Sequence, residues 1–149
     1  MRIYLDACCL NRPFDDQSQD RIRLESEAVK IALDLCSKGT HSWVISDVLE
    51  GEIERNPNFE KRDAVKSVLK GNNHRLVIND FAVEIARRVM AFGIRAMDAL
   101  HLGLAEAAGC DIILTVDDDL ILRSRKIQPP LSIRIENPVQ WVDKAVRQP

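Results

Sequence analysis

Two aspartates stand directly after short apolar segments of the sequence. Asp6 follows residues 3–5 (Ile-Tyr-Leu), and Asp117 follows the apolar run 112–116. If both segments are neighbouring parallel strands, the two carboxylates lie at the edge of the sheet where α/β proteins bind ligands. An aspartate at this place also caps the helix that follows a strand, so each residue alone has a structural explanation. Two further aspartates follow Asp117, and three adjacent acids repel one another unless a cation or a helix N-terminus compensates.

A glutamate occupies the apolar arc of the helix that we expect after the second strand. On a wheel of about 100° per residue, Glu52 lies between Val48 and Leu49, whereas Glu50 lies about 160° away on the solvent side. We therefore expect Glu52 to face the core. A buried carboxylate without a partner is costly, so Glu52 must either coordinate a metal ion or pair with an arginine.

Asp98 lies in a segment, residues 96–108, that is apolar on nearly every side and is therefore expected to form a buried helix. It shares one stripe with Leu102 and Ala105. It also lies in the first turn, where the helix dipole favours a negative charge. His101 follows one turn later, and we expect it to be a packed, hydrogen-bonded histidine outside the catalytic set.

Divalent-metal catalysis is the chemistry that these acids support. Carboxylate oxygens without thiolate or imidazole partners select Mg²⁺ or Mn²⁺ over zinc, and such ions bridge a phosphodiester and activate water. The sequence lacks the glycine-rich loops of nucleotide-binding proteins and the signatures of serine and zinc hydrolases. It also lacks the second aspartate that haloacid-dehalogenase phosphotransferases and response-regulator receivers need after the first strand.

The composition excludes several other classes of protein. The chain has 149 residues, of which 46% are hydrophobic, and a net charge of −2. It can therefore bury a core, but it is not a generally basic nucleic-acid binder. No apolar run approaches the ~20 residues that span a membrane, and Asp6 comes too early for a signal peptide. The four cysteines have no metal-binding spacing, so we expect free thiols and a cytoplasmic protein without a membrane partner.

Strand-like and helix-like segments alternate along the chain. The expected strands are residues 2–5, 41–45, 76–78, 111–116 and 131–135. The expected helices are residues 17–38, 46–55, 59–70, 80–92, 96–108, a short one ending at 125 and a last one starting at 138. This alternation favours an α/β fold in one domain, residues 1–149, with a parallel sheet covered by helices on both faces.

Four sequence segments carry a family resemblance that spans essentially the whole chain. They are YLDACCLNRPFDD (residues 4–16), SDVLEGEI (46–53), RAMDALHLGLA (95–105) and LTVDDDLI (114–121). In their order and spacing they resemble the PIN-domain ribonucleases of the VapC toxin-like branch. The resemblance implies a three-layer fold with a five-stranded parallel sheet and a Mg²⁺ or Mn²⁺ site at the strand ends. The acids that match the family pattern are Asp6, Glu52, Asp98 and Asp117, with Asp119 as a further ligand candidate on the same loop.

One position departs from the family pattern. The family often has a small hydroxyl residue or an asparagine two residues after the first aspartate, and here that position is Cys8. Asn11 is the polar alternative nearby. Thr115 stands where the pattern expects it, and we expect it to orient Asp117.

The working hypothesis is a metal-dependent endoribonuclease, in which the acids hold a Mg²⁺ or Mn²⁺ ion that activates water against an RNA phosphodiester. Arg12 lies near the first strand end and is expected to clamp a phosphate, whereas Arg123, Arg125 and Lys126 are interpreted as a solvated helix end. The alternative is a non-catalytic PIN-like module that binds RNA or a protein. The resemblance implies an antitoxin protein as partner, and the sequence leaves open whether the chain forms a homodimer.

Overall fold

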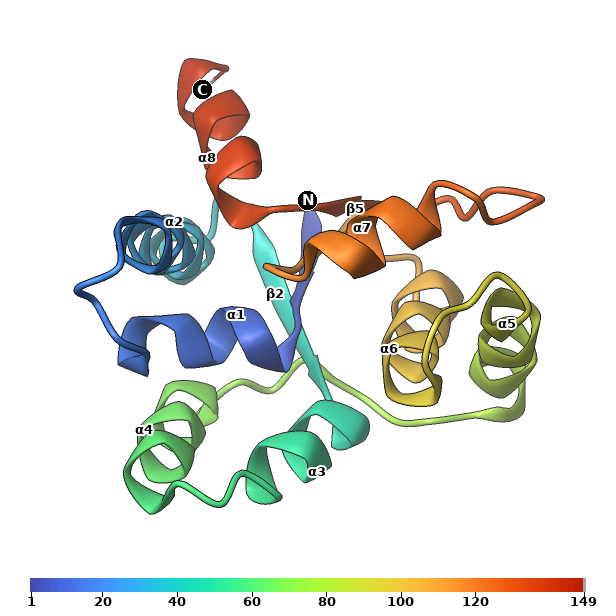
Figure 1. Ribbon diagram of the computed structural model, residues 1–149, viewed down its shortest axis with the longest axis horizontal. Helices are drawn as coiled ribbons and strands as arrows, with labels where there is room; N and C mark the ends of the chain where they lie inside the picture. Colours follow the sequence, from blue (N-terminus) through green and yellow to red (C-terminus); the bar gives the residue numbers. More distant parts are fainter. Residues whose placement is uncertain (149) are drawn as a thin grey trace.

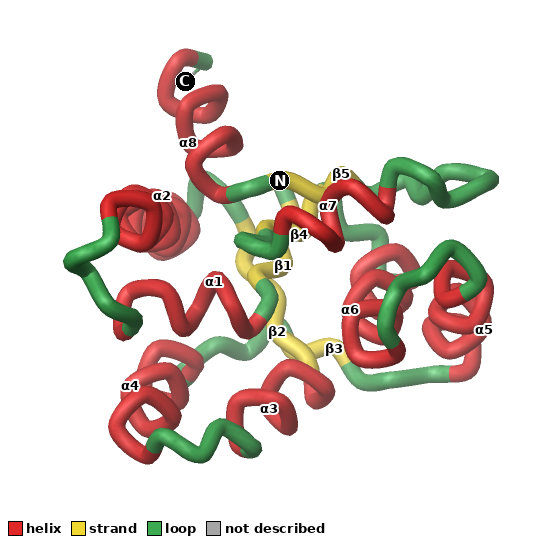
Figure 2. The backbone as a smooth tube through the Cα atoms, viewed as in Figure 1, coloured by secondary structure: helices red, strands yellow, loops and turns green. Residues whose placement is uncertain are grey.

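The computed structural model describes residues 1–148 and contains a five-stranded sheet whose neighbouring strands are all parallel. The strands are β1 (Arg2–Leu5), β2 (Ser42–Ser46), β3 (Arg75–Leu76), β4 (Ile112–Leu114) and β5 (Arg134–Glu136). Their order in the sheet is β3-β2-β1-β4-β5. Figure 1 and Figure 2 show the sheet running through the centre of the molecule.

Helices cover both faces of this sheet. They are α1 (Ala7–Asn11), the 3₁₀ turn η1 (Arg12–Phe14), α2 (Asp20–Ser37), α3 (Asp47–Glu54), α4 (Phe59–Leu69), α5 (Asp80–Met90), α6 (Ala96–Ala107), α7 (Asp118–Ser124) and α8 (Pro138–Arg147). Figure 1 shows α1, α2 and α4 on one side of the strands and α5 and α6 on the other. The predicted α/β class and five-stranded parallel sheet are therefore confirmed. Within residues 1–148, no helix has the length and apolar composition needed to cross a membrane.

The central strands are continuous apolar runs because both of their faces are covered. Ile3, Tyr4 and Leu5 of β1 and all three residues of β4 are buried. Parallel strands buried on both sides do not show the alternation of apolar and polar residues that marks a half-exposed sheet. The outer strands β3 and β5 each begin with an exposed arginine, Arg75 and Arg134.

The predicted elements lie within three residues of the observed bounds, and the starts of α2 and β5 differ most, by three residues each. β5 begins three residues later than predicted, because the backbone N–H groups of Ser132 and Ile133 donate to the Glu106 carboxylate at 2.9 and 3.0 Å. β3 covers residues 75–76 instead of 76–78, because only these two residues pair with β2. The start of β5 thus depends on a contact outside the sheet, whereas the length of β3 depends on its pairing with β2.

The short helix α1 and the turn η1 were not predicted from the sequence. A helix of five residues is too short to show the helical repeat of apolar side chains. Its formation depends on the Asp6 side chain, which caps its N-terminus, and on Cys9 and Leu10, which it buries in the core. The first acid of the predicted site is therefore fixed in the backbone on both sides, by β1 and by α1.

β1 lies where the path of the chain across the sheet reverses. From β1 the chain builds outward through β2 to β3, and β4 then returns to the opposite flank of β1. In open α/β sheets, the crevice at the carboxyl ends of such a strand pair is where ligands bind. Asp6 follows β1 at this crevice and Asp117 follows β4, so the sheet topology brings the two predicted acids to the same place.

Helix α6 is held against α5 by a close approach of the two backbones. A Cβ atom at Gly103 of α6 would collide with the carbonyl oxygen of Ala82 in α5, so only glycine permits this contact. Because α6 also carries Asp98 and His101, the contact fixes the position of both side chains relative to the sheet.

A buried ion-pair network joins α2 to the segments around it. The Glu25 side chain is 2% exposed and accepts hydrogen bonds from Arg12 Nε at 2.7 Å, Arg21 Nε at 2.9 Å and Asn137 Nδ2 at 2.9 Å. Burial alone raises the pKa of Glu25, but these hydrogen bonds outweigh it and hold the pKa below its ordinary value. The prediction that Arg12 clamps a phosphate is wrong, because its guanidinium is bound by Glu25 and by Asp15 at 3.2 Å.

We expect Glu25→Gln to lower the free energy of unfolding by about 3 kcal/mol at neutral pH, because it leaves a partly buried guanidinium without its counter-charge. The exposed Glu27→Gln, which loses only a surface pair with Lys30, should change it by less than about 0.5 kcal/mol. Since the pKa of Glu25 is lowered from 4.5, the difference should shrink as the pH falls below that value. Urea denaturation measures both quantities, and equal stability of Glu25→Gln and wild type would contradict the structural role.

Candidate active site

Asp6 combines a structural contact with a charge that the protein only partly compensates. It is 7% exposed, and its Oδ1 accepts hydrogen bonds from the Cys9 N–H at 3.0 Å and the Cys8 thiol at 2.8 Å. Burial raises the pKa of Asp6, and hydrogen bonds from Cys8, Thr115 and Cys9 offset this only in part. Both of the bonds above go to Oδ1, and Oδ2 takes part in neither. A nearby cation would therefore stabilise the ionised form of Asp6.

The thiol of Cys8, at the position where the family pattern often has a small hydroxyl residue or an asparagine, contacts both Asp6 and Thr115. Its Sγ atom lies 2.8 Å from Asp6 Oδ1 and 3.4 Å from Thr115 Oγ1, and it accepts a hydrogen bond from the Val116 N–H at 3.4 Å. A hydrogen bond with Cys9 lowers the pKa of Cys8, but burial and the Asp6 carboxylate outweigh it, so the thiol stays protonated. Cys8 thus connects the carboxyl ends of β1 and β4. Asn11 lies at the far end of α1 from Asp6.

Asp117 caps the N-terminus of α7 and also faces the crevice. Its Oδ1 accepts from the backbone N–H groups of Asp119 at 3.0 Å and Leu120 at 3.1 Å, which is the capping role considered for it. Its Oδ2 lies 3.3 Å from a guanidinium nitrogen of Arg95. Thr115 orients this residue through the backbone, because its hydroxyl accepts from the Asp117 N–H at 3.1 Å. Capping uses one oxygen and leaves the other for a cation.

Asp98 in the first turn of α6 is half-buried and shares Arg95 with Asp117. The Asp98 Oδ2 atom lies 3.5 Å from Arg95 Nε. Burial raises the pKa of Asp98; Arg95 lowers it, and the charges of Asp117 and Asp6 raise it further. The three aspartates therefore repel one another through space, although they come from three separate segments of the chain.

Glu52 lies on the predicted helix, but its exposure differs from the prediction. The side chains of Glu52 and Glu50 are 36% and 34% exposed, so the expectation that Glu52 is buried and Glu50 solvated is wrong. Their partners distinguish them. Glu52 Oε2 lies 2.6 Å from Nε2 of the buried His101, whereas Glu50 pairs with Arg75 of the outer strand β3. Helix α3 therefore presents Glu52 to α6 and Glu50 to the edge of the sheet.

The two aspartates that follow Asp117 bind other side chains. Asp118 accepts from both terminal nitrogens of Arg21, at 2.7 and 2.9 Å. Asp119 is exposed and accepts from Arg123 Nε at 2.7 Å, on the surface of α7. The basic residues at the end of α7 are exposed, as predicted. Of the three adjacent acids, only Asp117 thus contacts the residues around Asp98.

A family model describes this arrangement. The PIN domain model matches residues 3–126, a span that includes all five candidate acids. The chain belongs to the PIN domain family. The predicted resemblance to PIN domains is confirmed at this level.

Solved structures share the fold of this PIN domain at low sequence identity. The crystal structure of FitAcB from Neisseria gonorrhoeae has a TM-score of 0.59 at 16% identity, and the alignment covers 91% of this chain and 97% of that chain. VapBC2 from Rickettsia felis, bound to a DNA fragment from their promoter, has a TM-score of 0.59 at 14% identity, with coverages of 92% and 98%. FitAB bound to an IR36 DNA fragment has a TM-score of 0.61 at 14% identity, with coverages of 92% and 95%. No curated protein matches the chain significantly, and likeness at these identities shows the fold alone.

The donor atoms of this PIN domain fit a hard divalent cation. Asp6, Asp98 and Asp117 offer carboxylate oxygens, which are the ligands that Mg²⁺ and Mn²⁺ prefer. Arg95 already places one positive charge against two of these carboxylates. The chemistry of the site therefore favours a hard divalent cation.

Asp6, Asp98 and Asp117 do not offer three carboxylate oxygens that all lie within 4.8 Å of one another. Within residues 1–148, the only group of three or more potential ligands whose donor atoms all lie within 4.8 Å of one another is Asp6, Cys8 and Cys9. Burial raises the pKa of Cys9 well above its ordinary value, so its thiol stays protonated and is a poor ligand. The carboxylates are thus coupled by charge, and a bound metal would have to draw them closer.

Two contacts of the site were missed by the sequence analysis. Arg95 lies three residues before Asp98, a spacing at which side chains of one helix meet, so its pairing was open to prediction. The hydrogen bond between His101 and Glu52 joins two helices that are distant in the sequence, so no local sequence pattern predicts it. The sequence gives only indirect evidence for it, in the buried hydroxyl groups nearby. Tyr4 and Ser46 place hydroxyls in otherwise buried strands, and such groups need a polar partner in the core.

We expect Asp6→Asn to raise the stability of the metal-free protein by roughly 0.5–2 kcal/mol at neutral pH. Asparagine keeps an Oδ1 acceptor for the cap of α1 and removes the buried charge. Because the folded-state pKa of Asp6 is raised from 3.8, its ionisation costs stability as the pH rises through the folded pKa. The gain should therefore disappear in acid. Melting curves in EDTA at neutral and acidic pH measure this difference.

Asp16→Asn is the control for this measurement. Asp16 is exposed, and hydrogen bonds from Ser18 lower its pKa, so its loss should not stabilise the protein at neutral pH. Added Mg²⁺ should raise the melting temperature of wild type and not of Asp6→Asn. An Asp6→Asn protein that melts well below wild type in EDTA would show that Asp6 is a structural residue.

Proposed function

We propose that this PIN domain is a Mg²⁺- or Mn²⁺-dependent endoribonuclease of the VapC toxin-like type, active as one domain over residues 1–149. The proposal is carried by the meeting of Asp6, Asp98 and Asp117 at the crevice between β1 and β4. Two of these three carboxylates have raised pKa values, and each has fewer positive partners than a structural carboxylate such as Glu25. Perturbed acids in a ligand-binding crevice are typical of functional sites.

In this proposal the three aspartates would hold the cation, with Glu52 in the same acidic set and Asp119 as a further ligand candidate on the loop after β4. A bound divalent ion would lower the pKa of a coordinated water and stabilise the leaving oxygen of the RNA phosphodiester. The partly exposed carboxylate of Glu52 would accept a proton from the attacking water. The exposed Arg95, which contacts Asp98 and Asp117, replaces Arg12 as the proposed phosphate contact.

The second candidate function is a PIN-like module that binds RNA or a protein without turnover. Two observations favour it. The carboxylates are not already gathered at coordinating distance within the described residues, and the family position after the first aspartate holds the thiol of Cys8. The raised pKa values of Asp6 and Asp98, and the charge coupling of Asp98 to Asp6 and Asp117, favour the nuclease.

The partners proposed for this chain follow from the VapC-like resemblance. VapBC2 and FitAB are both described in complexes with DNA fragments. We propose that this chain pairs with an antitoxin protein and acts on RNA in the cytoplasm, and a second copy of the chain is a further partner candidate. A short open reading frame beside the gene would be the first place to look for the antitoxin.

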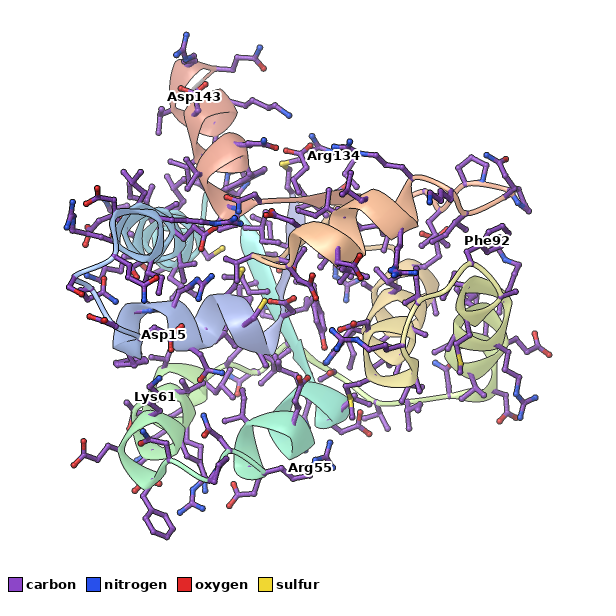
Figure 3. All side chains as sticks on the ribbon, in the orientation of Figure 1. Asp15, Arg55, Lys61, Phe92, Arg134 and Asp143 are labelled. Carbon is purple, nitrogen blue, oxygen red and sulfur yellow. The ribbon has the colours of Figure 1, made fainter. Side chains whose placement is uncertain are left out.

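We expect Asp98→Asn to weaken Mn²⁺ binding by more than the roughly 10–100-fold that losing a partner behind a metal ligand costs. The amide keeps the shape of the side chain and removes one charged donor. Isothermal titration with Mn²⁺ measures the affinity. Asp143→Asn on α8, labelled in Figure 3, is the control and should bind like wild type, because Asp143 pairs only with Arg147. Equal binding by Asp98→Asn and wild type would remove Asp98 from the site.

We expect Glu52→Gln to slow metal-dependent cleavage of a structured RNA at least about 100-fold, since that is the lower range for a lost general base. Glu50→Gln should leave the rate nearly unchanged. Glu50 is a matched control, because it lies on the same helix with the same exposure and has a different partner. Equal loss in both variants would contradict the assignment. A wild-type protein that binds RNA and cleaves none with Mg²⁺ or Mn²⁺ would favour the non-catalytic module.

A further inference from the structure

A chain of hydrogen bonds runs through the core and ends on Glu52. Ser46 Oγ lies 2.7 Å from the Tyr4 hydroxyl, which lies 2.6 Å from His101 Nδ1, and His101 Nε2 lies 2.6 Å from Glu52 Oε2. Ser46, Tyr4 and His101 are each 3% exposed or less. The chemistry proposed above uses none of these three side chains. Buried polar networks are costly when incomplete, so a complete one that ends on a site residue calls for a role.

The bond to Glu52 fixes the direction at the end of this series of hydrogen bonds. A carboxylate only accepts hydrogen bonds, so His101 Nε2 carries a proton and donates it to Glu52 Oε2. We assign the other bonds to match: the Leu49 N–H donates to Ser46 Oγ at 3.0 Å, the Ser46 hydroxyl donates to Tyr4, and the phenol donates to Nδ1 of a neutral His101. In this assignment every bond points toward the acidic site.

We propose that His101 is a positioning residue that holds the Glu52 carboxylate in one orientation through its Nε2–H. This inference rests on the proposed function, because Glu52 is the group that it positions. The bond occupies Oε2 alone and leaves Oε1 for water or a cation. A glutamate side chain that is one-third exposed otherwise samples several rotamers, and fixing it in one of them costs conformational entropy. Because the bond from His101 already orders the Glu52 side chain in the folded protein, a ligand that binds later does not have to supply this entropy cost.

The position of His101 in the fold explains why it suits this role. It lies one turn after Asp98 on α6, so a single helix carries a proposed metal ligand and the anchor of Glu52. Glu52 belongs to α3, whose N-terminus is capped by Ser46, the first member of the chain. This series of hydrogen bonds therefore joins the two ends of α3 to β1 through Tyr4 and to α6 through His101. The distance between Glu52 and the aspartates thus depends on core packing instead of on a surface loop.

The competing explanation is that His101 only satisfies the polar groups of the core. Only the positioning role predicts a change at Glu52 when His101 is replaced. The test therefore measures metal binding and cleavage as well as stability. His101→Leu removes the donor and keeps the volume, and His101→Gln restores an N–H near the Nε2 position. The variant His74→Leu, at an exposed histidine, is the control.

Two readouts are measured on folded proteins: Mn²⁺ affinity by electron paramagnetic resonance, and the rate of RNA cleavage. His101→Leu should weaken Mn²⁺ binding and lower kcat about 10–100-fold with little change in KM, as expected when the partner of a site residue is lost. His101→Gln should recover most of both losses. In a double variant with Glu52→Gln, His101→Leu should add no further loss, because it acts through Glu52. Unchanged affinity and rate in His101→Leu, or a fully additive double variant, would overturn the proposal.

A measurement that needs no activity separates this proposal from the proposed function. Long-range proton–nitrogen NMR of the metal-free wild type should show His101 as a single Nε2–H tautomer. Tyr4→Phe, which removes the donor to Nδ1, should allow the other tautomer and also serves if His101→Leu does not fold. A wild-type protein that shows this tautomer but neither binds Mn²⁺ nor cleaves RNA would contradict the proposed nuclease function, while the bond from His101 to Glu52 would stand. A mixture of tautomers in a wild-type protein that cleaves RNA would contradict the positioning role of His101 and leave the proposed nuclease function intact.

Discussion

Repulsion among carboxylates at the carboxyl ends of β1 and β4 is the constraint on which the site depends. Asp6 is buried there, and together with Asp117 it raises the pKa of the half-buried Asp98. Several weak interactions each offset part of this negative charge. Helix N-termini lie at Asp6 and Asp117, and Arg95 lies between Asp98 and Asp117. None of these interactions supplies a full divalent charge. The unliganded fold therefore carries an electrostatic cost that a cation would relieve.

The same chain shows what a purely structural buried carboxylate looks like. Glu25 is as deeply buried as Asp6, yet its pKa is lowered, because two arginines and an asparagine surround it. Asp6 receives its hydrogen bonds from a backbone N–H, a thiol and a hydroxyl, none of which carries charge, and its pKa is raised. Burial alone does not separate the two classes of acid. The charge of the partners does, and the uncharged partners of Asp6 support the functional role proposed for it.

The sequence predicts the sheet and the acids that follow its strands, since apolar runs and the residues after them are local features. It is less informative where partners come from distant segments. The helical wheel separates Glu52 from Glu50 by direction, but both are equally exposed, and only the contacts with His101 and Arg75 distinguish them. Those contacts cross from α3 to α6 and to β3, which no local pattern records. The role of Cys8 depends in the same way on a strand more than 100 residues away.

The shortness of the outer strands limits how another chain can join this one. β3 has two residues and β5 has three, and each begins with an exposed arginine. An added strand gains affinity from a row of free backbone groups, and such short, charged edges offer few of them. Sheet extension and edge-to-edge aggregation are therefore disfavoured. Recognition of side chains on its helices and loops is the mode of assembly that such edges favour, and there sequence variation can tune the choice of partner.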